Sequence, residues 1–133
     1  MTTDWRIVGA VSAGGVLGAL ARYGLTRAFP AAPGAFPWAV FAINVSGCLL
    51  LGALVVLVTE VVPAHRLTRP FLGTGVLGGY TTFSTAMVDT LRLFGRHAAT
   101  TALLYLFGTL LAALLAAWAG AVATRRLTLG RPR

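Results

Sequence analysis

The chain has 133 residues, of which 57% are hydrophobic and only 11% are charged, and its mean hydropathy is +0.82. This composition excludes an ordinary soluble domain and is typical of a membrane protein. The eleven basic residues, all of them arginine, outnumber three acidic residues and give a net charge of +8. Because these arginines lie at the ends of apolar runs, they indicate contact with lipid headgroups and no nucleic acid partner.

Four apolar runs follow one another along the chain, separated by short polar connections. A helix needs about 20 mainly apolar residues to cross the hydrocarbon core of a bilayer. The sequence therefore predicts an all-α, multi-pass protein of the cell (plasma) membrane, with one four-helix transmembrane domain over residues 1–133. The predicted spans are 5–26, 37–60, 70–94 and 98–124. We expect the first span to be retained and not cleaved as a signal peptide, because its glycines form a spaced pattern.

The arginines are divided unequally between the two faces of the membrane. In a four-span chain the N-terminus, the second connection and the C-terminus share one face, which holds seven arginines, whereas the other face holds four. The excess predicts a cytoplasmic N- and C-terminus, with a modest bias. The seven are Arg6, Arg66, Arg69, Arg125, Arg126, Arg131 and Arg133, and the four are Arg22, Arg27, Arg92 and Arg96.

Small residues recur at every fourth position in the first and fourth predicted helices. Such stripes let helix backbones approach closely inside a membrane. They predict packing faces, but leave open whether the packing lies within one subunit or between two. The stripes are Ala10, Gly14 and Gly18, and then Gly108, Ala112, Ala116 and Gly120.

The spans lack the side chains of the common membrane and enzyme chemistries. No Asp, Glu or Lys lies in the uncharged core of any span, which argues against a proton-coupled carrier. The chain also has no phosphate-binding loop, no HExxH motif, no Cys/His cluster and no neighbouring pair of carboxylates. The sequence therefore predicts that the protein is not an enzyme.

Polar side chains nevertheless occur at depth, most densely in the stretch GGYTTFST over 78–85. Two glycines followed by β-branched threonines weaken a helix, and hydroxyls can satisfy the backbone groups freed by a break. A broken third helix would offer carbonyls to a cation and amides to an anion. A simple helix kink is the alternative. Asn44 must likewise bond across helices or line a wet path.

Four separated motifs, spread over all four spans in order, resemble the CrcB/Fluc family of small fluoride channels. The most specific is the TTFST segment that follows a double glycine. The motifs are Gly14–Ala19 with Ala21–Tyr23, Asn44–Gly47 with Gly52, Gly75–Thr85, and Tyr105 with Thr109.

The resemblance implies an antiparallel, dual-topology dimer with two fluoride pores along the subunit interface. It implies that Arg22 lies in a vestibule, and that a structural sodium ion (Na+) is held by the main-chain carbonyls of Gly78 and Thr81 from each subunit. It also implies a set of residues that line the fluoride pore: Asn44, Phe83, Ser84, Tyr105 and Thr109. Flow through the pore would be passive and would export fluoride from the cytoplasm.

Four positions depart from the family's usual pattern. Ala86 stands where a second phenylalanine is usual, Val40 where threonine is usual and Ala113 where a hydroxyl is usual, while Asp89 replaces glutamate. Three of these changes remove groups that would line the pore. One reading is therefore a homodimer with a modified pore, and another is a heterodimer with a related subunit that supplies the missing groups.

Two readings from outside the channel class stay open. A small multidrug transporter would share the four-helix, dual-topology plan, but it would need a membrane-embedded acid. A non-conducting assembly subunit would need no pore at all.

Overall fold

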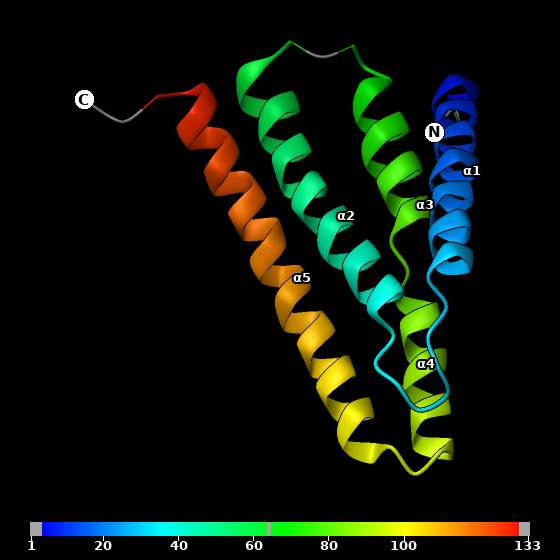
Figure 1. Ribbon diagram of the computed structural model, residues 1–133. Coiled ribbons are helices and arrows are strands. Elements are labelled where there is room, and N and C mark those ends of the chain that lie inside the picture. The colour runs from blue at the N-terminus through cyan, green and yellow to red at the C-terminus, as the bar shows by residue number, and fades with distance from the viewer. Residues whose placement is uncertain (1–3, 64, 131–133) are drawn as a thin grey trace.

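The computed structural model describes residues 4–63 and 65–130, and every element in these two ranges is helical. Figure 1 shows three long helical paths and a fourth made of shorter pieces. The long helices are α1 (Trp5–Ala28), α2 (Trp38–Val56) with the π-helical turn η1 (Leu57–Val61), and α5 (Ala99–Thr128). The fourth path consists of the π-helical η2 (Arg69–Leu77), α3 (Gly78–Tyr80) and α4 (Phe83–Gly95).

Three helices are long and apolar enough to cross a membrane by length and composition: Trp5–Ala28, Trp38–Val61 and Ala99–Thr128. Many of their large apolar side chains are exposed, as a lipid-facing surface requires. The prediction of an all-α membrane protein is confirmed for the part of the chain that the structure describes. The path from η2 to α4 does not count among the three, because no single piece of it is long enough.

Local signals in the sequence explain where the helices begin. The Asp4 carboxylate accepts a hydrogen bond from the Arg6 amide at 3.1 Å and caps α1. Pro70 lies in the first turn of η2, where its missing N–H costs nothing. Thr82 caps α4 with its hydroxyl. Between α1 and α2, Gly34 has a φ of +80°, which allows the connection to turn.

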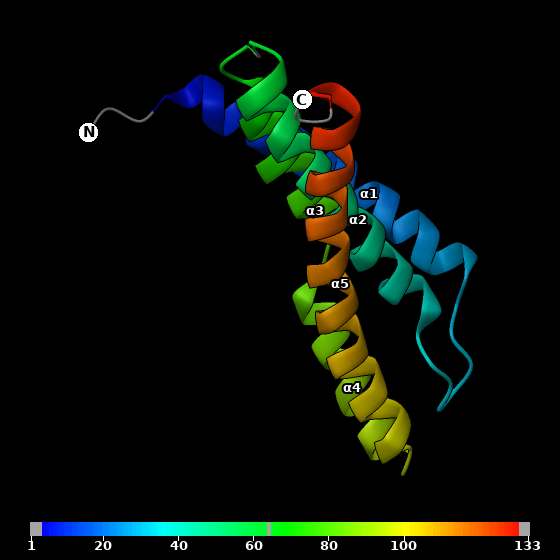
Figure 2. The same cartoon turned by 90° about the vertical axis from the view of Figure 1, so that its left-hand side faces the viewer.

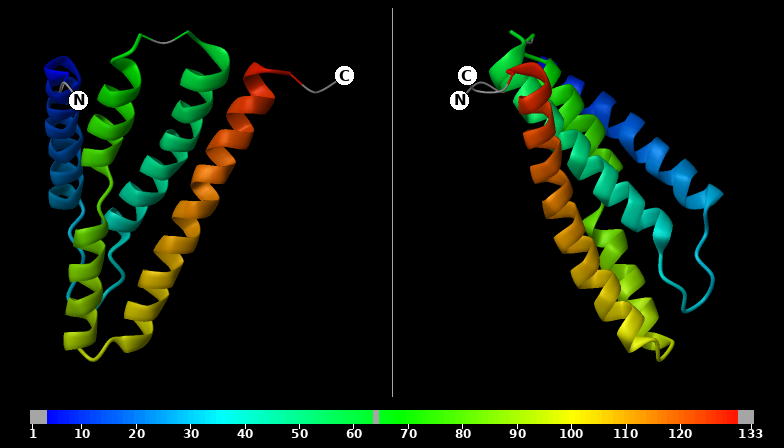
Figure 3. Two further views of the ribbon diagram at one scale, coloured as in Figure 1. Left: turned by 180° about the vertical axis from the view of Figure 1, so that it is seen from behind. Right: turned by 60° about the vertical axis from the view of Figure 1, so that its left-hand side comes forward.

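The connections place the chain ends together. Figures 1 and 3 show the N-terminal end of α1, the connection from η1 to η2 and the C-terminal end of α5 at one end of the molecule. Two ion pairs tie this end, one between Arg66 and Asp4 at 2.5 Å and one between Arg125 and Glu60 at 2.6 Å. Arg131 and Arg133, which the sequence assigned to this face, lie outside the described residues.

The helices form two closely packed pairs, α1 with η2 and α3, and α2 with α5. A Cβ atom added to Gly18 would meet the Val76 carbonyl oxygen. One added to Gly52 would meet the Ala117 carbonyl oxygen, and one added to Gly120 would meet the Leu49 carbonyl oxygen. The close approaches at Gly14, Gly18 and Gly120 therefore lie within one chain, whereas a Cβ on Gly108 meets nothing within 4 Å.

Candidate ion pathway

The polar stretch predicted from GGYTTFST lies at an interruption between α3 and α4. Helical backbone ends at Tyr80, and the next two residues are extended, with φ/ψ of −74°/155° at Thr81 and −150°/121° at Thr82. The Thr82 hydroxyl accepts a hydrogen bond from the Thr85 amide at 3.2 Å and donates one to the Thr85 hydroxyl at 2.9 Å. Thr82 thus starts α4 as its N-cap.

Asn44 of α2 is 7% exposed and reaches this interruption. Its Nδ2 donates to the Thr82 carbonyl oxygen at 3.0 Å, and its Oδ1 accepts from the Thr82 amide at 2.8 Å. The side-chain amide therefore pairs with both backbone groups of one residue, much as a neighbouring strand would. The buried Asn44 amide is therefore satisfied by backbone partners. One of its two Nδ2 hydrogens takes no part in these two hydrogen bonds.

Arg22 of α1 contacts the same segment from a second helix. It is half-buried, and its Nε donates to the Gly79 carbonyl oxygen at 3.2 Å. A guanidinium group at the C-terminal end of a helix also meets the negative end of the helix dipole. Two separate helices, α1 and α2, therefore hydrogen-bond to the interrupted path.

Arg22 also lines a cavity of about 540 Å³ between the end of α1, the connection 29–37 and α4. Figure 2 shows α1 and α2 tilted away from α4 and α5 toward the end that carries this connection. Three arginines and one acid line the cavity, which makes it electropositive. Its polar and charged lining is Arg22, Tyr23, Thr26, Thr85, Asp89, Arg92 and Arg96.

Sequence reasoning selected Arg22 but not the other two arginines of the cavity. The signal was present, because Thr85, Asp89, Arg92 and Arg96 are spaced four, three and four residues apart, which places them on one helix face. Within that face Arg92 lies 3.4 Å from the Asp89 carboxylate. Asp89, which stands where the family usually has glutamate, therefore lines the cavity.

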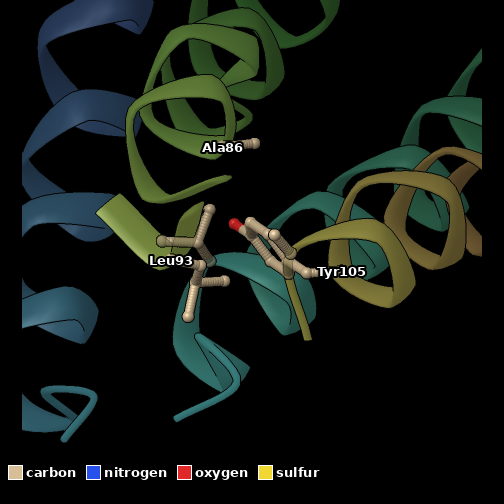
Figure 4. Close-up of a cluster of buried hydrophobic side chains, with 5 residues drawn as sticks. Ala86, Leu93 and Tyr105 are labelled. Atoms are coloured by element: carbon tan, nitrogen blue, oxygen red, sulfur yellow. The ribbon is translucent and has the colours of Figure 1, made fainter. Parts of the chain in front are cut away.

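Tyr105 and Thr109 of α5 are buried, with exposed fractions of 0% and 8%. Among the described residues neither hydroxyl has a hydrogen-bond partner. The Tyr105 ring packs edge-to-face on Phe36, with centroids 5.2 Å apart. In Figure 4 the Tyr105 side chain points from α5 toward α4, with its hydroxyl oxygen near Ala86 and Leu93.

Two of the four positions that differ from the family's usual pattern lie in this same buried cluster. Val40 and Ala86 pack with Tyr105 and Leu93 and are almost inaccessible. A phenylalanine at position 86 would have to displace these neighbours, because well-packed interiors do not accept extra volume freely. The small residue at this position is therefore matched to the packing of its own chain.

Phe83 and Ser84, in contrast, are exposed, and the Phe83 side chain has 76% of its surface open. The residues predicted to line a pore thus lie in two environments. Asn44, Tyr105 and Thr109 are buried between helices, while Phe83 and Ser84 lie on the outer surface of the chain.

Some backbone carbonyl groups at the interruption accept hydrogen bonds, and others do not. Gly79 and Thr82 accept hydrogen bonds from Arg22 and Asn44, respectively. In the described parts of the chain no hydrogen bond ends on the carbonyl oxygen of Gly78 or Thr81. Free carbonyl oxygens at a helix interruption are suitable ligands for a hard cation.

Comparison with known proteins relates this arrangement to a family. Residues 9–121 match the family model described as CrcB-like protein, Camphor Resistance (CrcB). The chain belongs to the CrcB family. The match to the CrcB model takes in most of α1, all of α2 and the interrupted path, and most of α5.

Curated relatives carry a more specific name. A Streptomyces coelicolor protein named fluoride-specific ion channel FluC 1 is 50% identical over 129 residues, covering 94% of this chain and 84% of its own. Proteins named fluoride-specific ion channel FluC 2 from Nocardia farcinica and Thermobifida fusca are 50% and 48% identical. Those matches cover 94% and 93% of this chain, and 89% and 92% of the relatives. Together with its apolar helices, membership of the CrcB family identifies the chain as a multi-pass membrane protein.

Proposed function

We propose that the chain is a subunit of a fluoride-selective ion channel, and not an enzyme, that passively exports fluoride from the cytoplasm and lowers its toxicity. The observation that carries the proposal is 50% identity, over 94% of the chain, to a protein named a fluoride-specific ion channel. Fluoride is small and strongly hydrated, so a selective pore must replace its water with several donors that bind weakly enough for release.

The proposed pore is lined by Asn44, Phe83, Ser84, Tyr105 and Thr109. Support comes from the buried hydroxyls of Tyr105 and Thr109, which have no partner among the described residues and can donate to an anion. The second Nδ2 hydrogen of Asn44 and the positive edge of the Phe83 ring are further donors. Arg22, in the electropositive cavity, would raise the local concentration of fluoride at the pore mouth.

The proposed assembly is an antiparallel, dual-topology dimer in which a second subunit covers the exposed half of this lining. The exposure of Phe83 and Ser84 beside buried Tyr105 and Thr109 supports it, because one chain alone does not enclose the set. The exposed α5 surface offers a close-packing site at Gly108, which is open in the single chain.

A structural sodium ion is proposed between the two subunits, held by the carbonyl oxygens of Gly78 and Thr81 from each. These are carbonyls that accept no hydrogen bond in the described parts of the chain. When bound, the ion would supply positive charge that offsets the repulsion between the carbonyl dipoles of two abutting helix ends.

The second candidate is a heterodimeric channel with a related partner. The seven-to-four division of arginines favours it, because a fixed orientation suits a subunit whose partner inserts the other way up. The apolar residues at Val40, Ala86 and Ala113 favour it also, since a related subunit could carry the usual polar or aromatic groups at its own corresponding positions. No described residue favours a multidrug transporter.

Fluoride efflux from liposomes, followed with a fluoride electrode, tests the proposal. We expect efflux from purified wild-type chain that is lost in Asn44→Asp or Phe83→Ile. Phe94→Ile is the matched control, because Phe94 is also an exposed phenylalanine of α4. Efflux that appears only after co-reconstitution with a related subunit would select the heterodimer, and its absence in both cases would refute the channel function.

A further inference from the structure

The interruption between α3 and α4 is held by side chains from the two other helices that approach it. We infer that Arg22 and Asn44 are positioning residues, which fix the interruption within a single chain by binding the backbone of Gly79 and Thr82 and leave the carbonyls of Gly78 and Thr81 among the free ones. The inference deepens the proposed function and rests on it only for the sodium ion. The hydrogen-bond arrangement itself stands without it.

The helical register shows how these carbonyls are left free. In a continuous α-helix the amide of each residue donates to the carbonyl four residues earlier. The Thr82 amide would therefore donate to Gly78, but it donates to Asn44 Oδ1 at 2.8 Å instead. The Thr85 amide would donate to Thr81, but it donates to the Thr82 hydroxyl at 3.2 Å. The diverted donors are thus the helical partners of Gly78 and Thr81.

The carbonyl of Gly79, the residue after Gly78, has a different environment. Gly79 would receive the Phe83 amide in a continuous helix, and here it receives the Nε of Arg22 at 3.2 Å. Thr82, which opens α4, has its own carbonyl bound by Asn44 Nδ2 at 3.0 Å. Replacement donors from α1 and α2 therefore cover Gly79 and Thr82.

Close helix contacts set the reach of both side chains. A Cβ on Gly47, three residues after Asn44, would meet the Thr81 methyl group, so the α2 backbone lies directly against the interruption. A Cβ on Gly18, four residues before Arg22, would meet the Val76 carbonyl oxygen and lie 2.7 Å from the Tyr80 amide nitrogen. Each positioning residue shares a helix face with a glycine that brings its backbone close.

The chemistry of the two side chains is specific to these tasks. Only an uncharged side-chain amide offers a donor and an acceptor at the spacing of a backbone N–H and C=O, so aspartate at position 44 keeps the acceptor and loses the donor. Arginine at position 22 adds a donor and a positive charge at a helix C-terminus, and lysine keeps both in a less directional form.

Selective isotope labelling reads both contacts directly, because the sequence contains one Gly-Tyr pair (79–80) and one Thr-Phe pair (82–83). Carbonyl-¹³C glycine with ¹⁵N-tyrosine selects the Gly79 carbonyl, and carbonyl-¹³C threonine with ¹⁵N-phenylalanine selects that of Thr82. Solid-state NMR in lipid bilayers then reports each carbonyl. A lost hydrogen bond moves a carbonyl resonance upfield.

We expect Arg22→Met to move the Gly79 resonance upfield and Arg22→Lys to restore much of it. Arg27→Met, a change of the same kind five residues further along α1, should leave it in place. Asn44→Leu and Asn44→Asp should each move the Thr82 resonance upfield, while Ser46→Ala should not. Two Asn44 variants are used so that a folding failure in one leaves the test intact. Unmoved resonances in both the Arg22 and the Asn44 variants would overturn the inference.

Sodium dependence separates this inference from the proposed function. The sodium concentration for half-maximal efflux should rise at least about tenfold in Arg22→Met, the usual loss when a residue that orients a metal ligand is removed, and stay unchanged in Arg27→Met. Moved resonances without any sodium effect would keep the positioning role and refute the sodium site.

Discussion

At the residue scale, the hydroxyl of Tyr105 has no hydrogen-bond partner in the part of the chain that the structure describes. A buried polar group left without a partner costs about 1–3 kcal/mol. The ring is fully buried and held edge-to-face by Phe36, so packing alone would be served as well by phenylalanine. Under the proposed function, we expect this hydroxyl to meet fluoride or water in the pore.

Tyr105→Phe should consequently separate stability from transport. We expect the free energy of unfolding in detergent to stay equal or rise by about 1 kcal/mol, because an unpaired buried hydroxyl is removed. Fluoride efflux should fall, because the pathway loses a donor. Tyr23→Phe, at an exposed tyrosine of α1, is the control for the stability measurement. A large loss of stability would show that the hydroxyl has a structural partner.

At the element scale, the glycines decide which helices touch. Gly18 and Gly75 allow α1 to lie against η2, and Gly52 and Gly120 allow α2 to lie against α5. In a membrane the hydrophobic effect does not drive helices together, so the van der Waals packing at such contacts supplies part of the stabilisation. The helix pairs therefore depend on the absence of single methyl groups.

Gly18→Ala should destabilise the fold by about 1–3 kcal/mol, the usual cost of overpacking, because its Cβ would meet backbone atoms of η2 and α3. Gly24→Ala lies in the same helix, and its Cβ would meet nothing within 4 Å. It should cause no loss. Denaturant titration of both variants in the same detergent measures the difference, and equal stabilities would show that α1 can shift to make room.

The elements were predictable from local signals, whereas their contacts were not. Apolar runs and Pro70 indicated helices, and GGYTTFST indicated a weak point near the position where helical backbone ends at Tyr80. The pairing of Asn44 with Thr82 spans 38 residues of sequence, and that of Arg22 with Gly79 spans 57. Such contacts depend on which helices pack together, which the order of apolar runs does not specify.

The environment of Ala86 illustrates the same limit. Sequence reasoning treated it as a missing pore ring, and its burial beside Tyr105 and Val40 became visible only once α2, α4 and α5 were placed. Arg92 and Arg96 were missed for a different reason. Their spacing on one helix face was readable from the sequence, but the cavity that the face lines was not.

At the scale of the whole molecule, the charged residues gather at its two ends. The end with the chain termini has ion pairs at Asp4 and Glu60, which involve two of its arginines. Acidic residues contribute little to the rule that sets orientation, so the arginine counts of seven and four remain the relevant quantities.

Arg69→Gln combined with Arg126→Gln should make insertion more nearly equal in both directions, since it lowers the larger count from seven to five. Neither residue belongs to the ion pairs at this end. A cysteine at position 128 in a Cys48→Ala background, labelled with a membrane-impermeant maleimide in intact cells, measures the outward fraction. Arg22 and Arg27 stay unchanged as the opposing charge. An unaltered outward fraction would show that features other than arginine fix the orientation.

The contact between α2 and α5 joins two helices that the whole interrupted path separates in the sequence. While the ribosome is still making the segments between them, the surface of α2 around Gly52 has only lipid to meet. Closure of the subunit therefore waits until α5 has been synthesised. A chain stalled before residue 99 would hold its earlier apolar segments in the bilayer and still be unable to close, so the synthesis of α5 is the step that allows this contact to form.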